Sequence, residues 1–194
     1  MSQLVPKEQA REILMPHASA LAMIMNESLV ELNLAMNATN ERWNNRAKCS
    51  TLHSLAIEKA KRHFVEQGGV LLKMKYQSLQ IVFNNSLVGR IKKVNHNNLS
   101  SNAKTYRNTD ILTHQLVLFS DETSLTFIDL GYKVDATWTY YERLVIVCRT
   151  NDSIEWTINI DNNNDATGTI TTLPLEPIVP LVREEKQIKI KKAE

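Results

Sequence analysis

The chain has 194 residues, of which 43% are hydrophobic and 23% are charged, with a formal net charge of +2. This composition is typical of one globular domain with a real core, and so small a net charge excludes binding to a polyanion through overall charge alone. Two cysteines, Cys49 and Cys148, lie far apart inside apolar patterns, which favours buried reduced thiols over a disulfide. Because no apolar run has membrane-spanning length and no secretory leader is visible, we expect a cytoplasmic protein without a membrane segment.

The first third of the chain is predicted to be helical. Apolar positions recur every three to four residues along one face formed by Leu21, Ile24, Met25, Ser28, Leu29, Leu32 and Met36. Pro16 suits the first turn of a helix, so we expect a separate short helix at 7–15. A second helix is predicted from the face formed by Cys49, Leu52, Ala56, Ala60 and Phe64. The pair Gly68-Gly69 is typical of its end.

Beyond this glycine pair the pattern is that of β-strands. The runs VLLKMKY, LQIVF and SLVGRIKKV predict an antiparallel meander over 70–94. Segment 109–119 fits either a helix capped by Thr109 or a strand. Further strands are predicted at 124–134, 143–149 and 153–160, the last with apolar and polar residues in alternation.

Helices precede strands without βαβ alternation, which predicts an α+β fold in which N-terminal helices pack on a mostly antiparallel β-sheet. We expect a helical part at 1–68, a sheet part of the same domain at 69–173 and an extended tail at 174–194. The aromatic residues expected to be largely buried are Phe127, Tyr132, Trp138 and Trp156.

The strand SLVGRIKKV carries the strongest local positive charge. The candidate nucleic-acid contacts are Lys73, Lys75, Arg90, Lys92 and Lys93. Strand alternation places Arg90 and Lys92 on one face, where they would bind phosphates or only keep the sheet surface solvated. A third alternative has Arg90 directed inward and paired with Asp129 or Asp135.

One catalytic pattern is incomplete. In RAKCSTLH, six residues separate Arg46 from His53, a spacing that resembles the Arg-x(4–6)-His motif of HEPN ribonucleases. That resemblance implies RNA cleavage by Arg46 and His53, but the strand-rich remainder of the chain does not suit an all-helical bundle. Cys49 lies four residues before His53 on the same face, where a base could meet a thiol. Neither a metal nor a cofactor is expected, since the histidines lack paired ligand spacing.

Four segments, RAKCSTLHSLAIEKAKRHF, GRIKKVN, LGYKVD and IEWTINI, follow one another in an order that resembles small uncharacterised proteins of bacterial prophages and mobile elements. The resemblance covers 46–161 and implies a setting in phage, toxin–antitoxin or phage-defence loci, without any catalytic residue. Our leading hypothesis is a non-enzymatic protein that binds a protein partner or forms a homo-oligomer. The helix of this chain that contacts the partner would carry Met15, Met23, Met25 and Met36. The alternatives are nucleic-acid binding by the basic strand and a ribonuclease.

Overall fold

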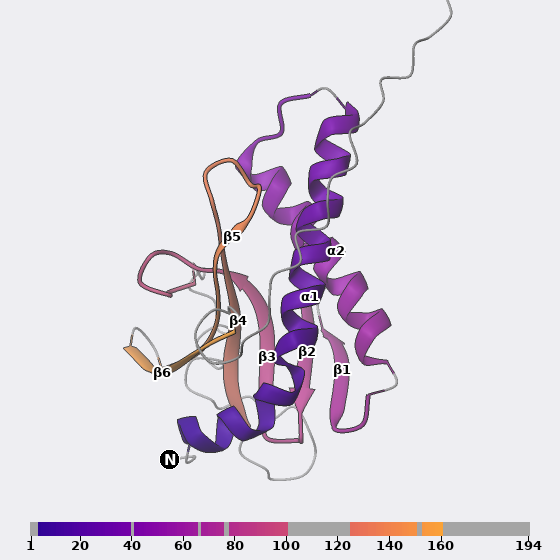
Figure 1. Ribbon diagram of the computed structural model, residues 1–194. Coiled ribbons are helices and arrows are strands. Elements are labelled where there is room, and N and C mark those ends of the chain that lie inside the picture. The colour runs from indigo at the N-terminus through magenta and orange to yellow at the C-terminus, as the bar shows by residue number, and fades with distance from the viewer. Residues whose placement is uncertain are drawn as a thin grey trace, which may run out of the picture.

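The computed structural model describes residues 4–39, 41–65, 67–75, 78–100, 125–150 and 153–160. These residues form two helices and one six-stranded sheet: α1 (Lys7–Thr39), α2 (Asn45–Phe64), β1 (Val70–Lys75), β2 (Ser78–Phe83), β3 (Leu87–Lys93), β4 (Thr126–Val134), β5 (Tyr141–Thr150) and β6 (Ser153–Asn159). Both helices lie together against the sheet (Figure 1), which confirms the α+β expectation. The predicted tail at 174–194 and the ambiguous segment 109–119 lie outside the described residues.

The expected helix break at Pro16 is wrong, because α1 continues through it from Lys7 to Thr39. A proline inside a helix removes one backbone hydrogen bond and bends the helix, and Figure 1 shows the first turns of α1 running at an angle to the rest. The buried face continues on both sides of the proline: Leu14 precedes it and Ala18 follows it. Burial of this continuous face outweighs the local cost of the proline.

Helix α2 begins where Asn44 accepts a hydrogen bond from the Ala47 backbone N–H at 2.8 Å, an N-cap that satisfies one of the unpaired donors of the first turn. Its predicted apolar face is confirmed, with Leu52, Ala56, Ala60 and Phe64 buried. The two helices pack side by side, and Lys59 of α2 forms ion pairs with Glu27 and Glu31 of α1.

The strands follow their sequence order across the sheet, from β1 at one edge to β6 at the other. All neighbours pair antiparallel except β3 and β4, which are parallel and join two three-stranded meanders. The predicted meander of β1, β2 and β3 is confirmed. In the parallel β3–β4 pair, Arg90 lies opposite Asp129, and in the β1–β2 pair Lys73 lies opposite Gln80.

Both faces of the central strands are buried. The face toward the helices forms the main core together with α1 and α2. The opposite face holds two smaller apolar clusters, one of Val82, Val88, Leu125 and Phe127 and one of Val94, Val145 and Val147. The expected burial of the aromatic side chains is confirmed for Phe127, Tyr132, Trp138 and Trp156. Strand β6 keeps the predicted alternation from Trp156 onward, with Trp156 and Ile158 buried and Asn159 exposed, whereas Ile154, expected on the buried face, is exposed.

Candidate functional site

Arg90 is not a surface residue. Its side chain and that of Asp129 are only 5% and 4% exposed, and its Nε and Nη2 atoms donate to Asp129 Oδ1 at 3.2 and 2.8 Å. Of the three alternatives that the sequence leaves open, the structure therefore has the inward ion pair with Asp129. Neither a phosphate contact nor a solvated surface fits this burial, so those two interpretations are wrong for Arg90.

The Arg90–Asp129 ion pair belongs to a larger buried polar cluster. The Ser100 hydroxyl donates to Asp129 Oδ2 at 2.7 Å, and Arg149 Nε lies 3.7 Å from the same oxygen. Gln80 lies on the same sheet face, and its fully buried side-chain amide has no hydrogen-bond partner. A buried carboxylate with three polar neighbours is a structural network that fixes the pairing of β3 with β4.

The other lysines of the basic strand differ in exposure. Lys73 and Lys92 are half-buried, whereas Lys93 is exposed. Lys75 is the last residue of β1 and its side chain lies outside the description. The five predicted nucleic-acid contacts therefore do not form one flat cationic surface. Lys93 instead lies over the ring of Trp138, with its Nζ atom 4.8 Å from the ring centroid.

Trp138 occupies a tight loop between β4 and β5. Its φ of +66° lies in the left-handed region, which a bulky side chain rarely adopts. The loop is held by the Asp135 carboxylate, which accepts hydrogen bonds from the backbone N–H groups of Thr137, Thr139 and Tyr140. Burial alone would raise the pKa of Asp135, but hydrogen bonds from Thr137 and from these N–H groups outweigh it and lower the pKa.

The loop also connects the sheet to both helices. Asn33 of α1 donates from its side-chain amide to the Trp138 carbonyl at 2.9 Å, and Lys48 Nζ of α2 lies 5.7 Å from the Trp138 ring centroid. Figure 1 shows this β4–β5 loop beside the first turns of α2. Sequence reasoning missed this cluster, because the three side chains on Trp138 come from distant parts of the chain.

The motif residues Arg46 and His53 both lie on α2. Arg46 is exposed and His53 is half-buried. Burial and the nearby positive charge of Lys92 lower the pKa of His53, so its imidazole is neutral at pH 7. A neutral imidazole can accept a proton as a general base. The effect of the Lys92 charge on His53 indicates that the end of β3 lies near α2. The sequence does not reveal this proximity.

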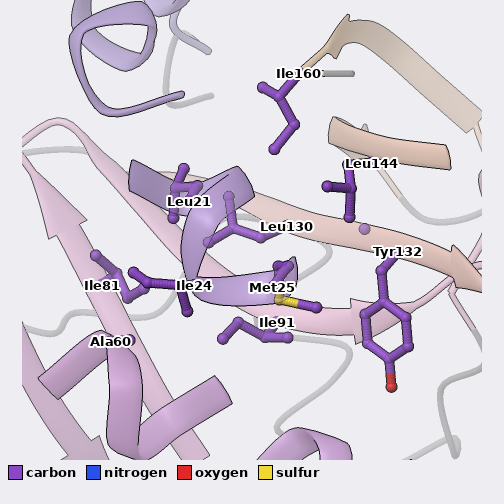
Figure 2. Close-up of a pocket in the computed structure, with 11 residues that line it drawn as sticks. Leu21, Ile24, Met25, Ala60, Ile81, Ile91, Leu130, Tyr132, Leu144 and Ile160 are labelled. Carbon is purple, nitrogen blue, oxygen red and sulfur yellow. The ribbon is translucent and has the colours of Figure 1, made fainter. Parts of the chain in front are cut away.

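A small apolar cavity lies in the core of the described residues. Figure 2 shows an apolar cavity lined by Leu21 and Met25 of α1, Leu130 and other core side chains. Its volume of about 10 Å³ is close to the space that one water molecule needs, far below the several hundred Å³ of typical ligand pockets. Among the same residues, no group of three His, Cys, Asp or Glu side chains could hold a metal ion.

The outer face of α1 carries exposed apolar residues. Met15, Met23, Val30 and Leu34 are 41%, 43%, 60% and 62% exposed. By contrast Met25 belongs to the core and Met36 packs against it, so only two of the four predicted methionines are available at the surface. Helix α1 is long and apolar enough to span a membrane, but core helices of soluble proteins meet the same criteria. One face of α1 is buried in this fold.

Comparison with known proteins identifies no relative. No protein family, no curated protein and no solved structure matches this chain. The resemblances to prophage proteins and to HEPN ribonucleases therefore stay predictions from short sequence segments.

Proposed function

We propose that this protein is a non-enzymatic binding protein that docks a protein partner on the outer face of α1. The observation that carries the proposal is the apolar stripe of Met15, Met23, Val30 and Leu34. Spacings of seven and four residues place Met23, Val30 and Leu34 on one side of the helix, opposite the buried face, and Met15 lies beyond the bend at Pro16. Exposed apolar side chains gathered in this way are typical of an interaction surface.

Charge indicates the chemistry of the partner. The exposed side of α1 carries Glu8, Glu12, Glu27 and Glu31, against Lys7 and Arg11. Even when Lys59 of α2 is counted, which pairs with Glu27 and Glu31, the acids outnumber the bases. A basic amphipathic helix of a partner protein would bury the stripe and complement these carboxylates. The flexible Met15 and Met23 side chains would adapt to its surface.

The resemblance to prophage and mobile-element proteins suggests where that partner is encoded. The partner is therefore expected among the products of neighbouring genes. A partner of this kind needs no catalytic centre in this chain.

The proposal is tested by co-expressing the chain with each neighbouring gene product and measuring complex mass and affinity. We expect one heterocomplex, and Met23→Glu with Val30→Glu should weaken it at least tenfold, because two carboxylates would enter an apolar interface. The matched control is Ser50→Glu with Ser54→Glu, which adds the same charge at exposed positions of α2. A complex that resists the α1 substitutions would refute the surface. A homodimer dissociated by them would identify a second copy as the occupant and refute the heterologous partner.

The ribonuclease alternative depends on one observation, the neutral imidazole of His53 on the helix that carries Arg46. It predicts cleavage of labelled RNA that is lost in a folded His53→Ala variant. If wild-type protein leaves RNA intact with and without divalent metal, this alternative fails, while binding to the α1 stripe can still be measured.

A further inference from the structure

Two lysines from distant segments converge on Trp138. The Nζ atoms of Lys48 and Lys93 lie 5.7 and 4.8 Å from the centroid of its ring. Within the described part of the chain neither lysine has a carboxylate within salt-bridge distance. Two ammonium groups near one indole repel each other, while the ring face attracts each of them. An anion that contacts both lysines would relieve this repulsion.

The positive charge extends beyond these two side chains. Lys92 precedes Lys93 in β3, and its charge reaches His53 of α2. Arg46 is exposed two positions before Lys48 on α2, where the helix turn directs the two side chains to different sides. These cations come from two elements and from both sequence motifs that were considered separately, but only Lys48 and Lys93 lie over the Trp138 ring, since Lys92 is on the opposite face of β3 from Lys93.

The position of the two central lysines is defined by a rigid support. Asp135 holds the backbone of the 135–140 loop, and Asn33 fixes the Trp138 carbonyl. Strained backbone that the surroundings enforce is characteristic of functional loops. Two residues after the buried Trp138, the same loop carries Tyr140, whose side chain is 60% exposed.

We propose that Lys48 and Lys93, together with Tyr140, form a binding site for single-stranded nucleic acid. The lysines contact successive phosphates, and Tyr140 stacks on one base. Positive side chains that follow the backbone, combined with an exposed aromatic ring, are the common features of single-strand binding sites. An acidic protein segment would satisfy the lysines but would leave Tyr140 without a base to stack on. The site is separate from the α1 stripe.

The test measures the binding of a fluorescein-labelled 12-nucleotide oligo(dT) and oligo(U) by anisotropy, at salt concentrations from 50 to 200 mM. For single strands, each phosphate contact contributes about 0.7 to the slope of log affinity against log salt. Lys48→Ala with Lys93→Ala should therefore lower the slope by about 1.4. Tyr140→Ala should weaken binding about tenfold and leave the slope unchanged.

Two control variants separate charge from packing. Lys7→Ala with Lys61→Ala removes the same charge from exposed parts of α1 and α2 and should keep the wild-type slope. Lys48→Arg with Lys93→Arg keeps the charge over Trp138 and should retain binding. The thermal unfolding of each variant is compared with that of the wild type, so that a loss of fold is recognised.

Four outcomes would overturn the proposal. The first is the absence of wild-type binding at 50 mM salt. The second is an equal loss of slope in the Lys7/Lys61 control. The third is a Tyr140→Ala variant that binds like the wild type. The fourth is displacement of the oligonucleotide by poly-glutamate at the same concentration of charges, which would identify a general site for acidic polymers.

Discussion

Arg90→Ala should be among the most destabilising substitutions in this chain. Removing one partner of a buried ion pair leaves the other charged and desolvated, which typically costs about 3–5 kcal/mol. Here the Asp129 carboxylate keeps the Ser100 hydroxyl at 2.7 Å and Arg149 at 3.7 Å. Because these two contacts to the Asp129 carboxylate stay in place, we expect a loss of stability near the lower end of that range, at about 3 kcal/mol. For a chain of this size, that corresponds to a decrease in Tm of about 6–12 °C.

The assay is urea unfolding followed by tryptophan fluorescence and by circular dichroism, with the slope against urea checked for constancy. Lys133→Ala is the matched control, because Lys133 pairs with Glu142 where both side chains are about one-third exposed. An exposed pair contributes about 1 kcal/mol or less. The double variant Arg90→Met with Asp129→Leu should recover only part of the loss, because it removes both charges of the pair but also the carboxylate that Ser100 and Arg149 contact.

Two results would refute this reasoning. If Arg90→Ala unfolds at the same urea concentration as the wild type, the guanidinium is not buried against Asp129 in solution. If the double variant is as unstable as the sum of the two single variants, the residues do not act as a pair.

Two further substitutions test other parts of the fold. Burial and the charge of Lys92 lower the pKa of folded His53 below its ordinary value of 6.5, so the unfolded chain binds the proton more readily. The stability of the wild type should therefore fall as the pH drops below 6.5. His53→Gln should flatten this pH dependence, measured by urea titrations at pH 5 to 8. An unchanged pH profile in His53→Gln would contradict the assignment. A Cβ atom at Gly131 would lie 2.8 Å from Val94 Cγ1 and 3.1 Å from the Val145 carbonyl oxygen. Gly131→Ala should therefore lower the stability by about 1–3 kcal/mol, measured by thermal unfolding. Gly68→Ala is the control and should lower it less, because the space around Gly68 is open. Equal Tm values for the two alanine variants would show that β4 and β5 adjust to the added methyl group.

The elements that depend on local periodicity could be predicted from the sequence. The buried faces of α1 and α2 and the six strands follow from apolar spacing within each segment. The break at Pro16 failed for a tertiary reason. The preference of a proline for the first helical turn is local, whereas the burial that keeps α1 continuous comes from its contacts with α2 and the sheet.

The candidate site was harder to predict, because its contacts are nonlocal. Alternation correctly assigned Arg90 to one face of its strand, but it could not show that this face is buried or that β4 pairs in parallel beside it. The same limit applies to Lys48, Lys93 and Trp138, which belong to three different elements. No spacing rule brings such residues together, and an unusual backbone angle at a tryptophan leaves no mark in the sequence.

The parallel β3–β4 pair has a consequence for the order of folding. Each three-stranded meander can form through short connections, whereas Arg90 and Asp129 are separated by 39 positions along the chain. Closing so long a loop costs more chain entropy before its contacts form. We therefore expect the two meanders to form early and the junction between them to close late. Weakening the Arg90–Asp129 contact should then accelerate unfolding more than it slows folding, so this junction controls the lifetime of the native state more than the speed of its formation.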